Sequence, residues 1–492
     1  MLSHLPILQV VVPMLMAPFV LLIQPARLAW ALTLSTSALA FAIAINLMPL
    51  AAGDNAMIYP IGGWEAPYGI ELRVDSLSVL FLLIISGAST FVLLAGYQSL
   101  VNEIHEAKLN WFFGAWLLAL AGLLGIVVSA DAFNIFVFME IASLASYILI
   151  AGGPNRQALP AVFKYLIMGT IGATFYLIGV GLIYIMTGTL NISDIATKLP
   201  SVVDQTPILV AAGFISIGLA LKAAIFPMHA WLPNTYCFAP NMVTAFLAAC
   251  STKIAIYVLL RVDFALFQSN LTGHLIQFKV FLIPLACMAI LAGAYMAIRD
   301  SLAKKIFAWS SVGQVGYIIL GAALVSHSGL TAALLHSFSH ALAKGTVFIG
   351  IGLLALQAKS GELSSFAGLG RRHPLAAIAI TIAGLSLVGI PGTAGFLSKW
   401  LLIQAILELP TGAVALLVVV LLSSLMSVVY LARFLETLFF SAPPVGNDTP
   451  LPLSAVAILV VLALASVYFG LAPTLPMELA TQAADNLLGY GA

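Results

Sequence analysis

Apolar stretches of about 20 residues recur along the whole chain and are separated by short polar segments. A bilayer with a hydrocarbon core of about 30 Å is crossed by roughly 20 helical residues. The pattern therefore predicts an all-α polytopic membrane protein with about fourteen transmembrane helices, at residues 5–23, 28–51, 76–100, 111–129, 133–152, 161–189, 207–232, 240–261, 275–299, 306–326, 328–357, 375–408, 411–440 and 451–472. Spans 6, 11, 12 and 13 exceed one straight crossing, so we expect them to tilt, kink or break.

The composition excludes a soluble protein, because charged residues make up 8% of the chain against about 25% in soluble domains. The 19 basic and 18 acidic residues leave no strongly basic face, which excludes nucleic acid as a partner. The three cysteines have no metal-ligand spacing, so we predict neither a metal nor a cofactor. The first apolar stretch lacks a basic leader and a small-residue cleavage site, and we interpret it as a retained span.

The distribution of basic residues predicts the orientation of the chain. When each loop is numbered by the span that it follows, odd loops and their flanks hold eleven Lys and Arg residues and even loops hold four. The positive-inside rule then places the odd loops in the cytoplasm. Both termini are expected on the outer, periplasmic side of the cell (inner) membrane.

Five ionisable residues lie well inside apolar spans: Glu140, Lys222, Lys253, Lys344 and Lys399. A charge at membrane depth costs about 2.5–3.5 kcal/mol on insertion scales, so such residues indicate either function or mutual pairing. Four ammonium groups facing one carboxylate cannot all stay charged in a dry interior. Some of the lysines are therefore expected to be neutral or hydrated and ready to exchange protons.

Two spans also carry helix breakers. Pro227 follows Lys222 in span 7, and Pro391-Gly392 precedes Lys399 in span 12. Such breaks persist in lipid only where protein or water satisfies the freed backbone groups. The lysine precedes one break and follows the other five spans later, which is typical of inverted repeats. We predict helices 1–3 at 1–110, a first repeat of helices 4–8 at 111–261, a second repeat of helices 9–13 at 275–440, and a last helix with a tail at 441–492.

The intramembrane groups form several candidate constellations. Glu140 and Lys222 are expected to pair, either as a structural ion pair or as a switchable pair beside a proton path. His336, His340 and Lys344 recur every four residues and share one helix face, which favours a proton relay. A metal or haem site is disfavoured there, because both imidazoles project from the same side of one helix.

Lysines near span ends can reach the membrane interface, and this is the alternative to a relay role for Lys253 and Lys399. His229, just after Pro227, is interpreted as a brace for the break or as an accessory proton carrier. Arg73 and Asp75, just before span 3, are interpreted as interface anchors.

Five sequence motifs carry a resemblance to a known family: VDSLSVLF from Val74, PMHAWLPN from Pro227, KIAIY from Lys253, SSVGQVGY from Ser310 and GIPGTAGFLSK from Gly389. With the fourteen spans, they resemble the antiporter-like subunits of respiratory complex I, membrane-bound hydrogenases and Mrp-type cation/proton antiporters. The resemblance covers roughly residues 70–440.

The resemblance implies a role for each intramembrane group. Glu140 and Lys222 would be the switching pair and Lys253 the central lysine. His336, His340 and Lys344 would form the relay, with Lys399 as the terminal lysine. The family usually has an acid and a histidine after the WLP of span 7, and this chain has Asn234 and Tyr236 there.

Within the family, an acid in span 5 with a lysine in span 12 resembles both the Mrp type and the longest complex I subunit. That complex I subunit has a long lateral helix after span 14, and the large A-type Mrp subunit is much longer than 492 residues, so the resemblance favours the D-type member of an Mrp antiporter. The resemblance implies a transporter subunit without its own redox or hydrolytic site. Its partners would be a larger A-like subunit, small membrane subunits, the lipid bilayer, H⁺ and Na⁺. Two alternatives remain: the proton-pumping subunit of a redox-driven complex I-like or hydrogenase complex, and the proton module of a CO₂/bicarbonate uptake complex.

Overall fold

The computed structural model describes residues 2–51, 56–268, 272–358, 360–442 and 450–489, with the backbone only for residue 268 and residues 272–280. Within these residues, twelve helices are long and apolar enough to cross a membrane. They are α1 (Leu5–Leu22), α2 (Ala26–Leu47), α3 (Ser76–Glu103), α4 (Leu109–Val128), α5 (Ala132–Ala151), α6 (Ala158–Thr187), α10 (Asn241–Val262), α11 (Thr272–Arg299), α12 (Ala303–Ala323), α13 (His327–Ala355), α17 (Ala413–Phe439) and α18 (Leu453–Leu471).

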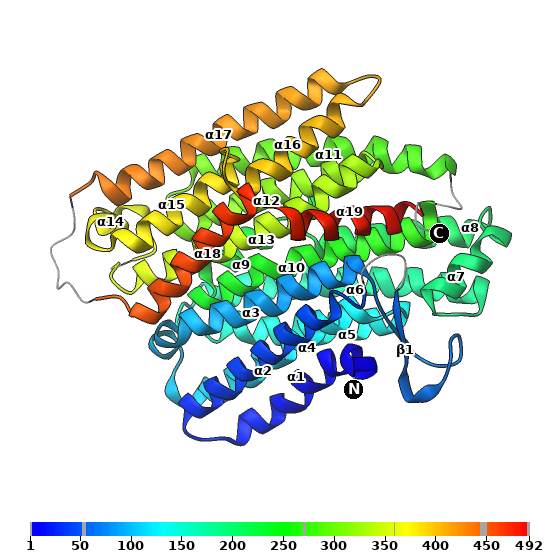
Figure 1. Cartoon of the computed structure of the whole chain (residues 1–492), viewed down its shortest axis with the longest axis horizontal. Helices are drawn as coiled ribbons and strands as arrows, with labels where there is room; N and C mark the ends of the chain where they lie inside the picture. The colour runs from blue at the N-terminus through cyan, green and yellow to red at the C-terminus, as the bar shows by residue number, and fades with distance from the viewer. Residues whose placement is uncertain (1, 52–55, 269–271, 359, 443–449, 490–492) are drawn as a thin grey trace.

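Both predicted breaks are present, so spans 7 and 12 each consist of two shorter helices. The pairs are α8 (Thr206–Lys222) with α9 (Leu232–Phe238) and α15 (Pro374–Val388) with α16 (Ala394–Leu407). Pro227 lies between the first two helices, and Pro391 and Gly392 lie between the second two. Gly392 has a φ of +86°, a conformation that favours glycine. Within the described residues, the two broken spans and the twelve continuous helices match the fourteen predicted crossings. Both termini lie at the same end of the bundle (Figure 1).

Local sequence explains where several helices begin and end. The Asp75 carboxylate accepts a hydrogen bond from the Ser78 amide at 3.0 Å and caps α3. Asp131 caps α5 and Ser326 caps α13 in the same way. These side chains satisfy amide groups that lack a partner in the first helical turn. Gly389 ends α15 with a φ of +92°.

Several short elements were not predicted. An antiparallel hairpin pairs β1 (Met57–Pro60) with β2 (Glu71–Val74) in the register Met57 to Val74. Two short helices are α7 (Ile192–Lys198) and α14 (Leu369–Arg372). Single helical turns of 3₁₀ or π type occupy Leu2–His4, Ile61–Gly63, Glu106–Lys108, Leu199–Ser201, Asp263–Gln268 and Leu363–Phe366.

The C-terminal segment contains more than the expected helix and tail. Its last part forms α19 (Thr474–Leu488), which packs on α3 and α13 through a buried side that includes Leu479 and Ala483. At its far end, the Asp485 carboxylate lies 3.1 Å from His327 at the start of α13. The C-terminal helix therefore covers part of the most buried helices of the bundle.

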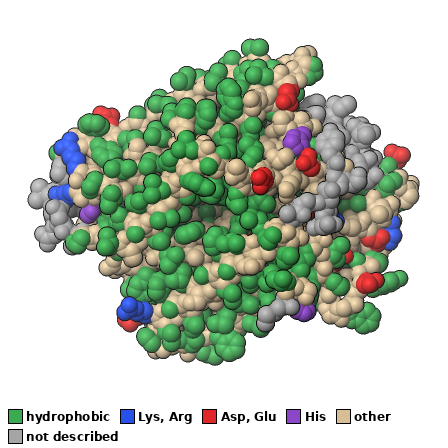
Figure 2. All heavy atoms as spheres, viewed as in Figure 1, with side chains coloured by type: hydrophobic (Ala, Val, Ile, Leu, Met, Phe, Trp, Pro, Cys, Tyr) green, Lys and Arg blue, Asp and Glu red, His purple; other side chains and the backbone are tan. Residues whose placement is uncertain are grey.

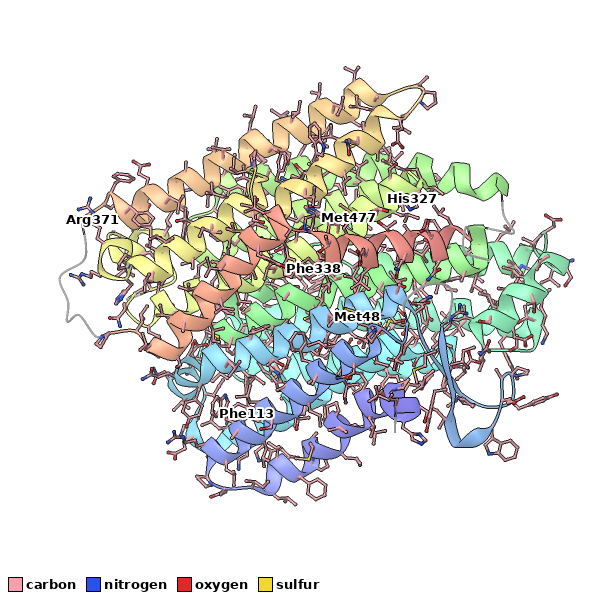
Figure 3. All side chains as sticks on the ribbon, in the orientation of Figure 1. Met48, Phe113, His327, Phe338, Arg371 and Met477 are labelled. Atoms are coloured by element: carbon pink, nitrogen blue, oxygen red, sulfur yellow. The ribbon has the colours of Figure 1, made fainter. Side chains whose placement is uncertain are left out.

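The helices form a buried centre and an outer layer. Most residues of α4, α10, α12 and α13 are buried, whereas most of α1, α11, α17 and α18 are not. Hydrophobic side chains cover the face seen in Figure 2, and Lys and Arg gather mainly at its left end. Arg371 lies at that end and His327 lies toward the other end (Figure 3). An apolar groove of about 440 Å³ lies between α2, α3, α13 and α18, and Phe338 and Met48 are among its lining residues. The polar site lies in the buried centre.

Candidate functional site: a buried chain of ionisable groups

The ionisable residues predicted from sequence lie on α5, α8, α10, α13 and α16, inside the bundle. Side chains of Lys253, His336, His340, Lys344 and Lys399 are at most 5% exposed. Among the described residues, Lys222 is the only one of the four intramembrane lysines with a carboxylate within 4.0 Å. The other three lysines are buried without a counter-ion at that distance.

Glu140 and Lys222 lie together, as the sequence predicts. Lys222 Nζ is 3.2 Å from Glu140 Oε1 and donates a hydrogen bond to Ser143 Oγ at 2.9 Å. Lys222 is the last residue of α8, and the negative end of a helix dipole favours a cation there. The break after α8 therefore contributes to placing this ammonium group opposite the carboxylate of α5.

A small cavity of about 40 Å³ extends from this pair toward α10. Its polar lining includes Lys222, Ser143, Ser146, Tyr165 and Ser251. A cavity holds a water molecule when it offers roughly 10–15 Å³ and polar partners. This one has room for no more than about three. It reaches α10 at Ser251, two residues before Lys253.

Lys253 is a buried lysine of α10 near the ionisable groups of α13. Its Nζ donates a hydrogen bond to the carbonyl oxygen of Ala248, within its own helix. An ammonium group at this position is within electrostatic reach of His336, His340 and Lys344. The long side chain is fully buried and does not reach the interface.

The three groups on α13 face different partners. The rings of His336 and His340 are nearly parallel, with centroids 6.2 Å apart. Both ring nitrogens of His340 are buried and lack a hydrogen-bond partner among the described residues. Lys344 Nζ donates to the Phe307 carbonyl oxygen at 2.6 Å and to the hydroxyl of Ser310, both on α12.

Lys399 occupies the break of span 12. Its Nζ donates to the carbonyl oxygens of Leu387 and Val388, both at 2.9 Å, and lies 4.5 Å from the centre of the Tyr317 ring. These carbonyls are the last ones of α15 and lack partners within that helix. The break therefore creates a binding site for the ammonium group, and the interface alternative for Lys399 is wrong.

Gln314 of α12 was not selected in the sequence analysis, although it lies within the SSVGQVGY motif. Its side-chain amide contacts His336 on one side and the Leu387 carbonyl on the other. Ser398 contacts the second ring nitrogen of His336 at 2.8 Å. The only sequence signal for Gln314 is an uncharged polar side chain in an otherwise apolar span.

The first break is braced by aromatic side chains. His229 stacks on Phe226, with ring centroids 5.1 Å apart, and meets the edge of Trp309. Its Nδ1 is buried without a partner among the described residues. Tyr236, one of the two departures from the family pattern, donates its hydroxyl hydrogen to the Leu247 carbonyl at 3.1 Å.

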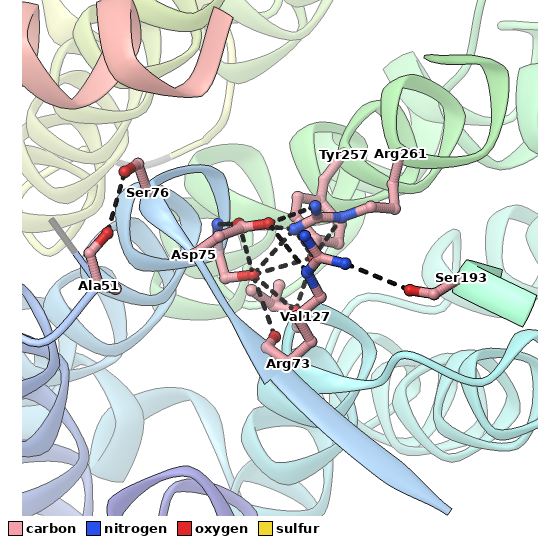
Figure 4. A network of polar contacts seen from close by, with 9 residues as sticks. Ala51, Arg73, Asp75, Ser76, Val127, Ser193, Tyr257 and Arg261 are labelled. Carbon is pink, nitrogen blue, oxygen red and sulfur yellow. Dashed lines mark hydrogen bonds and ion pairs between the residues drawn. The ribbon is translucent and has the colours of Figure 1, made fainter. Parts of the chain in front are cut away.

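The interpretation of Arg73 and Asp75 as interface anchors is wrong for Asp75, which is 3% exposed. Arg261 at the end of α10 donates two hydrogen bonds to this carboxylate, at 2.5 and 2.7 Å (Figure 4). Arg261 also contacts Ser78 and Tyr257. Burial favours the neutral carboxyl, but the charge and hydrogen bonds of Arg261, the Ser78 amide and the charge of Arg73 hold the pKa of Asp75 at about 2. This ion pair joins the start of α3 to the end of α10.

Intramembrane ionisable groups beside broken helices mark ion and proton pathways in membrane proteins. The fold and the buried chain of groups therefore place this molecule in the class of polytopic proton-translocating membrane subunits.

Comparison with known proteins identifies the family. The family model described as "NADH:quinone oxidoreductase/Mrp antiporter, TM" matches residues 129–427, more than half of the chain. The chain belongs to this family. The N-type subunit of the NADH-quinone oxidoreductase of Desulforudis audaxviator is 38% identical over 456 residues, covering 90% of this chain and 88% of that protein. The D-type subunit of the Na⁺/H⁺ antiporter of Bacillus subtilis is 28% identical over 497 residues, covering 99% and 97%.

Two solved structures share the fold over almost the whole chain. A chain of an archaeal membrane-bound sulfane sulfur reductase superposes with a TM-score of 0.90 and 30% identity, covering 99% of this chain and 98% of that one. A chain of the Mrp complex of a Dietzia species superposes with a TM-score of 0.89 and 26% identity, covering 99% and 97%. The family expected from the sequence motifs is confirmed, and its antiporter and redox-linked branches both include relatives of this chain.

Proposed function

We propose that this chain is the proton-translocating subunit of a multisubunit Na⁺/H⁺ antiporter. The observation that carries the proposal is the set of three buried lysines, Lys253, Lys344 and Lys399, with no carboxylate within 4.0 Å among the described residues. Desolvation makes a charged ammonium group costly at such positions. Lysines placed this way can hold a proton for a time and release it to a neighbour.

The proposed proton route runs from Glu140 through the buried groups of α8, α10 and α13 to Lys399. A proton arriving at Glu140 would neutralise the carboxylate and release Lys222 from its ion pair. The small cavity beside Lys222 would hold the water that links it to α10 and Lys253. From there His336, His340 and Lys344 would relay the proton, and Lys399 would exchange it at the second break. His229 is proposed only as an accessory group near the first break.

The assembly and membrane orientation are part of the same proposal. The antiporter relative from Bacillus subtilis and the Mrp complex of the Dietzia species support partnership with other membrane subunits. A larger A-like subunit among them remains part of the proposal. The excess of Lys and Arg in odd loops supports a cytoplasmic position for those loops in the cell membrane. Both termini would then lie on the outer side.

We also propose that helices α4–α10 and α11–α17 are the two inverted repeats. Each unit contains one broken span, and the pair α8/α9 in the first unit corresponds to α15/α16 in the second. In both units a lysine ammonium group lies at the C-terminal end of the first half-helix. The equivalence of the two breaks supports equivalent roles for Lys222 and Lys399.

Specific observations also favour one alternative, the proton-pumping subunit of a redox-driven complex. The Desulforudis relative belongs to a NADH-quinone oxidoreductase, and one of the solved structures is a sulfane sulfur reductase. The same proton route would then be driven by electron transfer elsewhere in the complex. The driving force distinguishes the two functions.

Proton flux in inverted membrane vesicles containing the full complex tests the proposal. Glu140→Ala and Lys222→Ala should each abolish flux without loss of assembly, whereas Glu140→Asp should keep part of it because the charge remains. The matched control is the pair Lys198 and Asp194, 2.8 Å apart on the short helix α7 between α6 and α8, whose alanine variants should transport normally. Normal flux in Lys222→Ala would contradict the route.

Sodium dependence decides between the two functions. In the antiporter, adding Na⁺ to vesicles with an imposed pH gradient should dissipate the gradient. Flux that requires an electron donor and ignores Na⁺ would instead support the redox-driven complex.

A further inference from the structure

We infer that Gln314 is a positioning residue that fixes the protonation geometry of His336 and links it to the Lys399 site. This inference rests on the proposed function, because it concerns proton transfer between His336 and Lys399, two groups of the same route. Gln314 is 2% exposed, and both the nitrogen and the oxygen of its side-chain amide have hydrogen-bond partners. No other described side chain contacts both His336 and a carbonyl that binds Lys399.

The orientation of the Gln314 amide follows from its partners. On one side it lies 3.2 Å from the Leu387 carbonyl oxygen, which can only accept a hydrogen bond. The NH₂ group must therefore point there, and the amide oxygen must point at His336. That oxygen is 2.8 Å from Nε2 of His336 and can only accept. Nε2 of His336 must therefore carry a hydrogen.

This hydrogen bond selects one tautomer of the neutral imidazole. With the hydrogen on Nε2, the free lone pair is on Nδ1, which is 2.8 Å from Ser398 Oγ. Proton exchange between His336 and α16 therefore takes place at Nδ1. The residue after Ser398 is Lys399, so the exchanging nitrogen faces the helix that carries the terminal lysine.

The Ser398 hydroxyl can serve both protonation states of His336. It can donate to Nδ1 of the neutral ring, or donate to the Gly395 carbonyl at 3.1 Å and accept from the charged ring. In the transfer from His336 toward Lys399, the Nδ1–H bond of the charged ring breaks as a new O–H bond forms on Ser398. The proton first carried by Ser398 would pass through a water molecule to the neutral amine of Lys399, because Lys399 Nζ contacts Leu387 and Val388 and not Ser398 among the described residues. Throughout, the Nε2 hydrogen stays on His336 and remains bonded to the Gln314 oxygen.

The second contact of Gln314 ties this step to the second break. The Leu387 carbonyl accepts from Gln314 at 3.2 Å and from Lys399 Nζ at 2.9 Å. The bond from a charged ammonium group is the stronger of the two. Gln314 and Lys399 therefore compete for the Leu387 carbonyl oxygen. When Lys399 loses its charge, its hydrogen bond to this oxygen weakens and the one from Gln314 is favoured.

Gln314→Leu tests the inference, because leucine has a similar size and no hydrogen-bonding group. Loss of one hydrogen bond worth about 1.4 kcal/mol corresponds to about tenfold, so we expect proton flux to fall about tenfold in an assembled complex. Gln9→Leu is the matched control. Gln9 is also fully buried, and its amide atoms have no hydrogen-bond partner among the described residues. This variant should transport normally.

Gln314→Glu gives a second, independent readout. The carboxylate keeps an acceptor for Nε2 and adds a negative charge, which favours the protonated imidazole. The pH profile of flux should therefore shift to higher pH while part of the flux remains, a change that a purely structural role would not produce. If the leucine variant fails to assemble, the pH profile of Gln314→Glu alone tests the role of Gln314.

The outcomes separate this inference from the proposed function. Normal flux in Gln314→Leu, or an unshifted pH profile in Gln314→Glu, overturns the role of Gln314. The proposed route still stands in that case if Lys399→Ala abolishes flux. Normal flux in both Gln314→Leu and Lys399→Ala would overturn the proposed route itself.

Discussion

Replacing Asp75 tests how far the buried ion pair at the end of the bundle stabilises the fold. Asp75→Asn removes the charge opposite Arg261 but keeps a side-chain oxygen that can cap α3 through the Ser78 amide. Asp75→Ala removes the charge and the cap together. Comparing the two variants therefore separates the two contributions.

The contacts of Asp75 determine how large a destabilisation we expect when it is replaced. Arg261 and the other groups around Asp75 lower its pKa from 3.8 to about 2. At about 1.4 kcal/mol per unit, this lowering corresponds to about 2 kcal/mol. Arg261 has 14% of its side chain exposed, and a buried partner left unpaired costs about 3–5 kcal/mol. We expect Asp75→Asn to destabilise the fold by about 3 kcal/mol, and Asp75→Ala by about 1 kcal/mol more through the lost cap.

The pH dependence follows from the sign of the shift. Because the pKa is lower in the folded state, the stabilisation is complete above about pH 4 and is lost as the pH falls through about 2. The difference between wild type and Asp75→Asn should therefore stay constant from pH 6 to pH 8.

Thermal unfolding in detergent can be followed with a fluorophore that reacts with the buried thiols of Cys237 and Cys250. For a chain of 492 residues, about 3 kcal/mol corresponds to a fall of roughly 3 °C in Tm. Asp194→Asn, at the exposed pair with Lys198, is the control and should shift Tm far less. If Asp75→Asn unfolds like wild type and only Asp75→Ala is destabilised, the cap matters and the ion pair does not.

Two further predictions concern the second break. Lys399→Arg keeps donors for the carbonyls at the end of α15, but a guanidinium group does not release its proton, so the complex should assemble and show as little proton flux as Lys399→Ala. Normal flux in either variant would place the end of the route elsewhere. Gly395→Ala would put a Cβ 1.9 Å from the Ser386 carbonyl oxygen and should prevent α16 from packing, seen as loss of folded protein on size-exclusion chromatography. Gly213→Ala has no neighbour within 4 Å and should fold normally; equal yields would contradict the predicted clash.

The sequence predicts best those features that stand out in an apolar background. A lysine, a carboxylate or a Pro-Gly pair inside a span is visible without a structure, and Glu140, Lys222 and both breaks lie where the pattern places them. The pairing of Glu140 with Lys222 also follows from charge, since one acid faces four lysines. The hydropathy pattern therefore predicts the transmembrane helices and also the charged residues and helix breakers inside them.

Other features that depend on tertiary contacts were not predicted. Asp75 and Arg261 are 186 positions apart, and each lies at a span end where charged residues normally face water. Gln314 carries no charge, so a search for ionisable groups passes over it. The β1–β2 hairpin and α19 are too short or too polar to produce a transmembrane signal. In each case the partner across the fold defines the role of the residue.

The cavity beside Lys222 has a consequence for electrical insulation. A space of about 40 Å³ cannot contain a continuous column of water, and a metal ion would have to shed most of its hydration shell to enter it. A proton needs no such space, because it moves by exchange between hydrogen-bonded groups. In the proposed route, protons would pass this point one at a time, and the small cavity would hold back larger hydrated ions and so help to maintain the voltage across the membrane.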